Sequence, residues 1–381
     1  MALSVGVPRE SAPGEARVAL APDAVKRLVR KGCEVIVERG AGEPAFLSDG
    51  VFEAAGARLG TRAEALGCEA VATVAGLGHA DLGAIREGAV VIGMLRPLDD
   101  PEPVRQLAAR GATAVAMELV PRTSRAQRMD ALSAMSTVAG YRAALLAALH
   151  LPRFFPLLTT AAGTVRPARV LVIGAGVAGL QALATARRLG AVTAAYDVRE
   201  AAREQVESVG ASFVELDLDA GDQEDAGGYA KALAADQQAR QVAALAKVLP
   251  EYNAVITTAL IPGRAAPQLI TADGLAGMMP GSVIVDLAAA NGGNVDASRP
   301  DEPVVSHGVT VLGPTNLPAE MPTHASEMYG RTVAAFLLEF LDDDGALHLD
   351  PDDEIVAGAV VARGGEIVHP RVLAALEPAT P

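Results

Sequence analysis

The feature that most constrains this chain is a glycine pattern that directly follows an apolar stretch. Gly174, Gly176 and Gly179 form the spacing GxGxxG between the apolar segment Arg169–Ile173 and a helical pattern. In such a turn the first glycine reverses the chain, the second lets the backbone approach a pyrophosphate, and the third lets helix and strand pack closely. The helix N-terminus then presents a partial positive charge to the phosphates. Because close packing alone can also require these glycines, the pattern needs a second signal.

The second signal is an acidic residue at the end of the next expected strand. Asp197 follows the segment Val192–Tyr196 and lies 23 residues after Gly174. A carboxylate in this position can accept hydrogen bonds from a ribose diol and repels a 2′-phosphate. Together the two signals predict a dinucleotide site that prefers NAD(H) to NADP(H). Arg199, two residues further on, leaves open a contact with a 2′-phosphate.

Apolar runs alternate with helical patterns along most of the chain, which predicts an α/β fold of two Rossmann-like domains with parallel sheets. A length of 381 residues is sufficient for two hydrophobic cores. The strands expected in the first domain are Leu3–Val7, Glu34–Val37, Ala70–Val74, Val90–Met94 and Thr113–Met117. Those expected in the second are Arg169–Ile173, Val192–Tyr196, Ser212–Leu216, Ala254–Thr258, Ser282–Leu287 and Val309–Leu312. The expected helices are Pro22–Lys31, Pro101–Arg110, Asp130–His150 and Ser326–Leu341, and a hairpin is expected over Ile355–Val368.

The same pattern gives the domain boundaries. We expect a discontinuous N-terminal domain at residues 1–128 plus 320–381. An NAD(H)-binding domain is expected at 129–319, with a long linking helix at 130–150 and a cleft between the two domains. The segment 217–231 is acidic, contains glycine and lacks apolar periodicity. Long inserts of this kind in compact domains are usually functional lids or disordered segments, and the sequence pattern leaves both open.

Composition excludes several other classes of protein. A net charge of −14 argues against a nucleic-acid surface, which requires clustered Lys and Arg. Cys33 and Cys68 lack the spacing of a metal site, so we expect no metal and two reduced thiols in a cytoplasmic protein. The chain begins without an apolar signal region, and Tyr141 and Arg142 interrupt the apolar stretch Ala131–Leu149. We therefore expect no direct membrane insertion.

Groups that could transfer a proton are scarce near the expected nicotinamide. Dehydrogenases that oxidise an alcohol or an amine commonly use a His or a Lys as the base. The chain has four lysines, all in helical or lid patterns. None of its histidines falls at the end of a central strand near the expected nicotinamide, so we expect surface or capping roles for all six: His79, His150, His307, His324, His348 and His369.

One polar cluster remains, in the loop that precedes the long helix. It contains Arg122, Gln127, Asp130 and Ser133. Asp130 and Ser133 share one face of the helix start. Arg122 could pair with Asp130, which would leave Gln127 to bond a carboxamide and would leave no free proton acceptor near neutrality. A solvated loop with a helix N-cap explains the same residues equally well.

Longer segments of the chain resemble the soluble NAD(H)-binding component of proton-translocating NAD(P)+ transhydrogenases, which is domain I of their alpha subunit. The similar segments span nearly the whole chain, and PRTSRAQRMD (121–130) and GGYA (227–230) are the most specific. Further similar segments are PGEARVALAP (13–22), CEVIVERGAG (33–42), ITTALIPGRAAPQLIT (256–271) and MPGSVIVDLAAANGGN (279–294).

The resemblance implies a site for each part of NAD(H). The loop that would hold the nicotinamide, and act as the catalytic site, consists of Arg122, Gln127, Asp130 and Ser133. The residues that would hold the pyrophosphate are Gly174, Gly176, Val177, Ala178 and Gly179. The residues implied at the adenosine ribose are Asp197, Val198 and Arg199. Those implied to line the nucleotide cleft are Thr258, Ala259 and Leu260, and those on the mobile lid are Gly228 and Tyr229.

The resemblance also implies the reaction and the partners. In this family a hydride passes, with Si-specific/Re-specific stereochemistry, between NADH and NADP+ held on an NADP(H)-binding domain of the beta subunit, and membrane-spanning partner subunits translocate protons. We expect a homodimer that docks on these partners at the inner face of the cell membrane. Because the chain ends at Pro381 without a membrane span, we expect the split form of the enzyme. Transfer between two nicotinamide rings releases no substrate proton, so it needs only close apposition in dry surroundings.

Two alternative functions stay open. Alanine dehydrogenases are similar, but their pattern has a lysine in the segment matching 72–78, a histidine in that matching 93–98 and an aspartate before the Gly-Gly. This chain has neither the lysine nor the histidine, and Ala290 stands at the third position. Arg17 matches their substrate-carboxylate arginine and is retained. The other alternative is a non-catalytic module that binds NADH and transfers no hydride to any partner.

Overall fold

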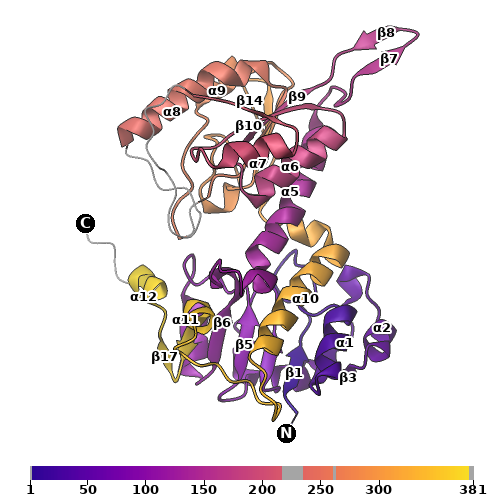
Figure 1. Ribbon diagram of the computed structural model, residues 1–381, viewed down its shortest axis with the longest axis vertical. Coiled ribbons are helices and arrows are strands. Elements are labelled where there is room, and N and C mark those ends of the chain that lie inside the picture. Colours follow the sequence, from indigo (N-terminus) through magenta and orange to yellow (C-terminus); the bar gives the residue numbers. More distant parts are fainter. Residues whose placement is uncertain (1, 217–234, 261–262, 377–381) are drawn as a thin grey trace. The chain divides into compact units, whose positions relative to one another are not determined.

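The computed structural model describes residues 2–216, 235–260 and 263–376, which form two compact units. Unit 1 comprises the chain up to Met135 and from Pro318 onwards, and unit 2 comprises Ser136–Leu317. Each unit contains one large sheet with helices on its faces (Figure 1). The sequence prediction placed its breaks after residue 128 and before residue 320.

The sheet of unit 1 has eight strands in the order β3-β2-β1-β4-β5-β6-β16-β17. Six are parallel to one another: β1 (Ser4–Val7), β2 (Glu34–Glu38), β3 (Arg58–Gly60), β4 (Ala70–Ala72), β5 (Val90–Gly93) and β6 (Thr113–Ala116). The last two strands, β16 (Val360–Arg363) and β17 (Glu366–Ile367), extend the sheet from β6 with antiparallel pairing. The helices are α1 (Pro22–Arg30), α2 (Asp49–Ala54), α3 (Arg62–Leu66), α4 (Glu102–Ala109), α10 (Pro322–Glu339), α11 (Glu354–Ala359) and α12 (Pro370–Leu376).

The sheet of unit 2 has seven strands in the order β11-β10-β9-β12-β13-β15-β14. They are β9 (Arg169–Ile173), β10 (Val192–Tyr196), β11 (Ser212–Phe213), β12 (Ala254–Thr257), β13 (Val283–Asp286), β14 (Val304–Ser306) and β15 (Val309–Leu312), and only β14 is antiparallel to its neighbour. The helices are α6 (Val177–Arg188), α7 (Ala202–Ser208), α8 (Ala235–Val248) and α9 (Ala272–Gly277).

Both sheets have the same doubly wound order. The strand order reverses between β1 and β4 in unit 1, and between β9 and β12 in unit 2. In open parallel sheets, ligands bind outside the carboxyl ends of the strands at this reversal. The fold therefore points to the loops after β1, β4, β9 and β12, and the prediction of two Rossmann-like α/β domains with parallel sheets is confirmed.

Helix α5 (Ala131–His150) begins in unit 1 and continues into the core of unit 2. Its Ala143, Ala144 and Ala147 are fully buried beside Val170 and Val172 of β9. By length and composition α5 is the one helix in the described part of the chain that could cross a membrane, although core helices of soluble proteins pass the same test. A third of the most apolar 18-residue stretch of α5 is buried inside the protein.

Several elements differ from the sequence prediction. The segment expected to be the first strand of a hairpin begins instead with α11, because Asp353 caps this helix by accepting hydrogen bonds from the backbone N–H groups of Ile355 and Val356. The short strands β3 and β14 were not predicted. Nor was the hairpin of β7 (Leu158–Thr160) and β8 (Gly163–Val165), which projects from the rest of unit 2 (Figure 1). Its side chains are mostly exposed, so it carries no apolar alternation that would mark a strand.

The close approach of α5 to α6 gives a first prediction. A Cβ at Gly140 would lie 2.0 Å from the carbonyl oxygen of Ala178, which is backbone and cannot move aside cheaply. We expect Gly140→Ala to lower the free energy of unfolding by about 1–3 kcal/mol, despite the better helix propensity of alanine. Gly50→Ala is the matched control, because Gly50 lies in α2 with no atom within 4 Å of its Cβ position.

We expect Gly50→Ala to be neutral or to raise the free energy of unfolding by up to about 1 kcal/mol. Chemical denaturation followed by circular dichroism measures both variants. An equal response of the two would show that the contact between Gly140 and Ala178 does not limit the packing of α5.

Candidate functional site

The glycine-rich loop joins β9 to α6, and its three glycines have three different environments. Gly174 has φ +98°, a left-handed conformation that side chains disfavour. A Cβ at Gly179 would lie 1.9 Å from the carbonyl oxygen of Gly174, so only glycine lets α6 approach the loop this closely. Among the described residues, no atom lies within 4 Å of a Cβ placed at Gly176, so the described part of the chain leaves open space in front of the second glycine.

The start of α6 is suited to an anion. Gly176 is the N-cap in an extended conformation, and in the described part of the chain no side-chain hydrogen bond caps the helix. The first backbone N–H groups of the helix belong to Val177, Ala178 and Gly179. They carry the positive end of the helix dipole toward the open space at Gly176. A pyrophosphate fits this combination of uncapped N–H groups and missing side chain.

Asp197 lies directly after β10 and is tied to the glycine-rich loop. Its Oδ2 accepts a hydrogen bond from the backbone N–H of Ala175 at 2.7 Å. The Arg199 guanidinium donates to both carboxylate oxygens, through Nε to Oδ1 at 3.0 Å and through Nη2 to Oδ2 at 2.9 Å. The backbone N–H of Arg199 also donates to Oδ1, at 2.9 Å. The Asp197 side chain is only 5% exposed, and Val198 follows it partly buried.

The segment after β12 lies against the same loop. The Thr258 hydroxyl donates a hydrogen bond to the carbonyl oxygen of Gly174 at 2.8 Å. Ala259 and Leu260 follow, and the Leu260 side chain is 38% exposed. The structure therefore brings Thr258 and Asp197 to the glycine-rich loop, from the strands on either side of β9. Gly228 and Tyr229 of the expected lid lie outside the described residues.

The polar loop before α5 belongs to unit 1. Arg122 and Gln127 are exposed, whereas Ala126 and Met129 are buried where this loop packs on α10. The Asp130 carboxylate accepts hydrogen bonds from Ser133, at 2.7 Å from the backbone N–H and at 2.6 Å from the hydroxyl. Asp130 thus caps the start of α5 through Ser133.

Arg125 anchors this loop to a distant part of the chain. Its Nε donates to Glu339 at 3.0 Å and its Nη2 pairs with Asp353 at 2.5 Å. These two carboxylates lie at the end of α10 and at the N-cap of α11. Arg125 therefore holds the loop in place while Gln127 remains exposed, and sequence reasoning had assigned Arg125 no role.

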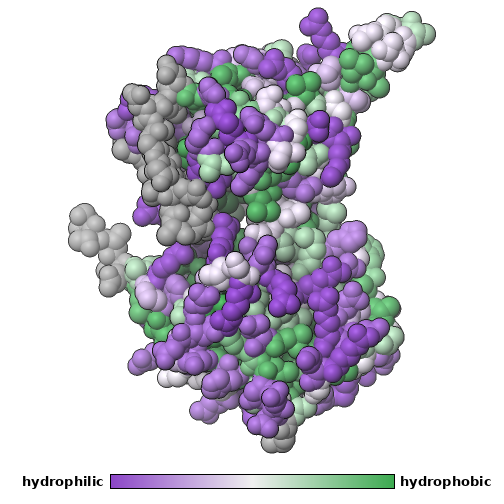
Figure 2. Space-filling view, viewed as in Figure 1, coloured by the Kyte–Doolittle hydropathy of each residue, from purple (hydrophilic) through white to green (hydrophobic). Residues whose placement is uncertain are grey.

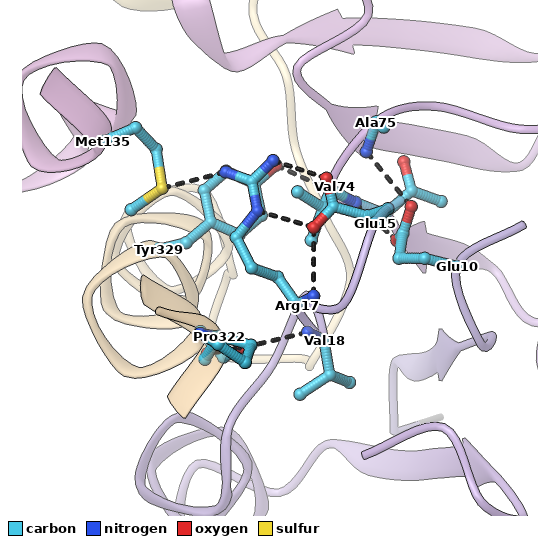
Figure 3. Close-up of polar contacts among 11 residues, drawn as sticks. Glu10, Glu15, Arg17, Val18, Val74, Ala75, Met135, Pro322 and Tyr329 are labelled. Carbon is cyan, nitrogen blue, oxygen red and sulfur yellow. Dashed lines mark hydrogen bonds and ion pairs between the residues drawn. The ribbon is translucent and has the colours of Figure 1, made fainter. Parts of the chain in front are cut away.

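The corresponding edge of unit 1 contains a buried charged cluster (Figure 3). The Arg17 guanidinium is paired with both oxygens of Glu15, at 2.7 and 2.5 Å, and also contacts the Met135 sulfur at 3.1 Å. Glu10 accepts hydrogen bonds from the backbone N–H groups of Val74 and Ala75, just after β4. The charge of Arg17 is therefore matched within the protein.

Two glutamates at this edge titrate near neutrality. Burial raises the pKa of Glu10 to about 7, although backbone N–H groups favour its charged form. Burial likewise raises the pKa of Glu118 to about 7, and Glu118 accepts a hydrogen bond from the backbone N–H of Arg96. Neither residue belongs to a recognisable sequence motif, and their strong desolvation is a tertiary effect.

The histidines and cysteines hold no candidate cluster. Among the described residues no group of three or more His, Cys, Asp or Glu could hold a metal ion. Cys33 and Cys68 are free and buried, each with a pKa raised by burial. Five histidines are exposed. His369 is only 8% exposed, with a pKa lowered mainly by burial, and it directly precedes α12, where its carbonyl oxygen accepts hydrogen bonds from the backbone N–H groups of Val372 and Leu373.

Comparison with known proteins places these features in a family. Two family models match the chain: "Alanine dehydrogenase/PNT, N-terminal domain" over residues 6–139 and "Alanine dehydrogenase/PNT, C-terminal domain" over residues 143–370. An NAD(P) transhydrogenase alpha subunit from Rhodospirillum rubrum is 47% identical over 97% of this chain and 98% of its own length.

Solved structures agree with this comparison. A transhydrogenase from Sinorhizobium meliloti has a TM-score of 0.86 and 41% identity, covering 96% of this chain and all of that one. An L-alanine dehydrogenase has a TM-score of 0.82 and 26% identity, covering 98% of this chain and 99% of that one. The resemblance predicted from the sequence is confirmed, and the chain belongs to the alanine dehydrogenase/PNT family, with NAD(P) transhydrogenase alpha subunits among its relatives.

Proposed function

We propose that this protein is the NAD(H)-binding component of a proton-translocating transhydrogenase. The observation that carries the proposal is the loop from β9 to α6, where open space at Gly176 meets an uncapped helix N-terminus beside the carboxylate of Asp197. This arrangement fits the pyrophosphate and the ribose of a dinucleotide. The 47% identity to a transhydrogenase alpha subunit over nearly the whole chain supports this particular member of the dinucleotide-binding enzymes.

Each part of the bound coenzyme has proposed partners. Backbone N–H groups from Gly174 to Gly179 hold the pyrophosphate, and the segment from Asp197 through Val198 to Arg199 binds the adenosine ribose. Thr258, Ala259 and Leu260 line the site. Arg122, Gln127, Asp130 and Ser133 form the loop that orients the nicotinamide, with Gly228 and Tyr229 on a lid that closes over it. When bound, NADH supplies the hydride.

The chain's own residues have a positioning task in this reaction. The acceptor NADP+ is held on the NADP(H)-binding domain of a partner beta subunit, so the two rings must meet face to face. Rings in close apposition, without water, need no proton acceptor from this chain. Proton translocation is then carried out by membrane-spanning partner subunits through conformational coupling, and this chain lies on the inner face of the membrane through them.

A homodimer also belongs to the proposal. The β7–β8 hairpin and its base expose apolar side chains: Phe154 is 58% exposed, Leu157 59% and Val165 43%. In Figure 2 the projecting hairpin is pale to green, in contrast to the purple residues of the neighbouring helices. Burial of such side chains against a second copy would remove apolar surface from water.

The alternative of an alanine-type dehydrogenase has less support. The loop after β4 carries Ala75 and the loop after β5 carries Arg96, and these loops are bonded through their backbones to Glu10 and Glu118. The loop after β4 lacks the lysine of the alanine dehydrogenase pattern, and the loop after β5 lacks its histidine. A non-catalytic NAD-binding module would require the glycine-rich loop. It would not require an exposed Gln127 on a loop that Arg125 anchors.

The most direct test mixes the full chain with the NADP(H)-binding domain of a transhydrogenase beta subunit. We expect hydride transfer from NADH to an NADP+ analogue of distinct absorbance in the mixture only, because each protein supplies one coenzyme. The chain alone, given NAD+ and L-alanine, should form no NADH. Oxidation of L-alanine would favour the dehydrogenase, and NADH binding without transfer would favour the non-catalytic module.

The Asp197 carboxylate predicts coenzyme preference. We expect NADH to bind at least about tenfold more tightly than NADPH, because the carboxylate accepts from the ribose diol and repels the 2′-phosphate. In a fluorescence titration, Asp197→Asn should bring the ratio of the NADPH dissociation constant to the NADH dissociation constant closer to one. Glu200→Gln removes the same charge from an exposed position nearby and serves as the control. A ratio unchanged by Asp197→Asn would remove Asp197 from the ribose site.

The exposed position of Gln127 predicts a kinetic effect. Gln127→Asn shortens the side chain and keeps the amide, so transfer in the mixture should slow by about 100-fold if Gln127 aligns the ring. The NADH dissociation constant should change by less than about threefold, because most binding contacts are elsewhere. Gln106→Asn, on α4 of the same unit, is the control. Equal losses in binding and transfer would make Gln127 a binding residue only.

A further inference from the structure

A buried aspartate at the end of β13 organises the carboxyl edge of the unit 2 sheet. Asp286 is 0% exposed and its carboxylate accepts four hydrogen bonds. The donors are the Thr257 hydroxyl at 2.9 Å and the backbone N–H groups of Ala288 at 2.9 Å, Asn294 at 2.8 Å and Val295 at 3.3 Å. With its charge satisfied in this way, Asp286 fixes the backbone of Asn294.

The Asn294 side chain is fully buried and bonded on both of its polar atoms. Its Oδ1 accepts from the backbone N–H of Ala259 at 3.2 Å, and its Nδ2 donates to the carbonyl oxygens of Ala259 at 2.9 Å and Pro267 at 2.8 Å. A primary amide offers an acceptor and two N–H donors in one plane, which matches these three hydrogen bonds. Asn294 therefore holds the backbone of Ala259 from both sides.

The segment held by Asn294 is attached to the glycine-rich loop at its other end. Thr258 donates through its backbone N–H to Ile173 at 2.9 Å and through its hydroxyl to Gly174 at 2.8 Å. Residues Thr258 and Ala259 are thus fixed between the first glycine of the loop and a buried amide. This is the reversal of strand order at which a ligand of this fold binds.

We propose that Asn294 is a positioning residue for the dinucleotide. Its side-chain amide binds the backbone of Ala259 and thereby fixes the position of the segment Thr258–Leu260 at the nucleotide site. The inference rests on the proposed binding of NAD(H). Asn294 acts only through this segment and is not itself a contact of the coenzyme.

The matched experiment compares one chemical change at opposite edges of the same sheet. Asn294→Asp keeps an oxygen that accepts from the Ala259 N–H. It replaces the NH2 donor by a second oxygen, which faces the carbonyl oxygens of Ala259 and Pro267 and cannot donate to them when ionised. Asn253→Asp makes the same change at the amino edge, where Asn253 is buried and accepts from the backbone N–H of Arg169 at 2.9 Å. NADH fluorescence titration of the full chain gives the dissociation constant, and thermal unfolding gives the stability of each variant.

We expect Asn294→Asp to raise the NADH dissociation constant about tenfold, as expected from two lost hydrogen bonds, and Asn253→Asp to leave it within about twofold. The difference should persist well below both unfolding temperatures, which a merely structural role would not produce. Equal dissociation constants for the two variants would overturn the inference. If Asn294→Asp does not fold, Asn294→Ala against Asn253→Ala is judged by the same criterion.

The same titrations distinguish a failure of the proposed function from a failure of the inference about Asn294. A wild-type chain that does not bind NADH removes that function, and the inference with it. A wild-type chain that binds NADH, together with an Asn294→Asp variant that binds it equally well, overturns the inference alone.

Discussion

The contact that organises unit 2 is the approach of α6 to the end of β9, which position 179 permits only without a side chain. Because of this approach, the backbone of the glycine-rich loop lies within hydrogen-bond distance of Thr258 and Asp197. Gly174 then accepts a hydrogen bond from Thr258, and Ala175 donates one to Asp197. The ends of three adjacent strands are thereby bonded to one turn, and the start of the helix lies at the open space beside Gly176.

Unit 1 has the same strand order, but its reversal point has a different chemistry. There the loops after β1 and β4 carry Arg17 paired with Glu15, and Glu10 bonded to the backbone. In unit 2 the loop after β9 presents backbone N–H groups, beside the Asp197 carboxylate that follows β10. The same architecture thus has a filled, charged edge in one unit and an open edge in the other, which illustrates that a fold does not determine its site.

Much of this was accessible from the sequence, because the signals were local. The strand, turn and helix around Gly174 depend on short-range patterns, and β9, β10 and β15 lie at the predicted residues. The expectation for Asp197 followed from a fixed spacing. The domain boundaries and the assignment of Arg122, Gln127, Asp130 and Ser133 to a nicotinamide remain predictions.

What the sequence did not reveal depends on contacts between distant segments. Asn294 is 35 residues from Ala259, and although it ends the family-similar segment 279–294, the sequence assigns it no role. The raised pKa values of Glu10 and Glu118 arise from burial, which appears only after the strands are assembled. The short β3, β7, β8 and β14 lack apolar periodicity, so tertiary context defines them rather than pattern.

The anchoring of Arg125 has a consequence for how the protein is made. Its two carboxylate partners, Glu339 and Asp353, are 214 and 228 residues further along the chain. During synthesis from the N-terminus, all of unit 2 is translated before either partner is added to the chain. The loop carrying Gln127 therefore gains the ion pairs of Arg125 only after the whole of unit 2 has been translated.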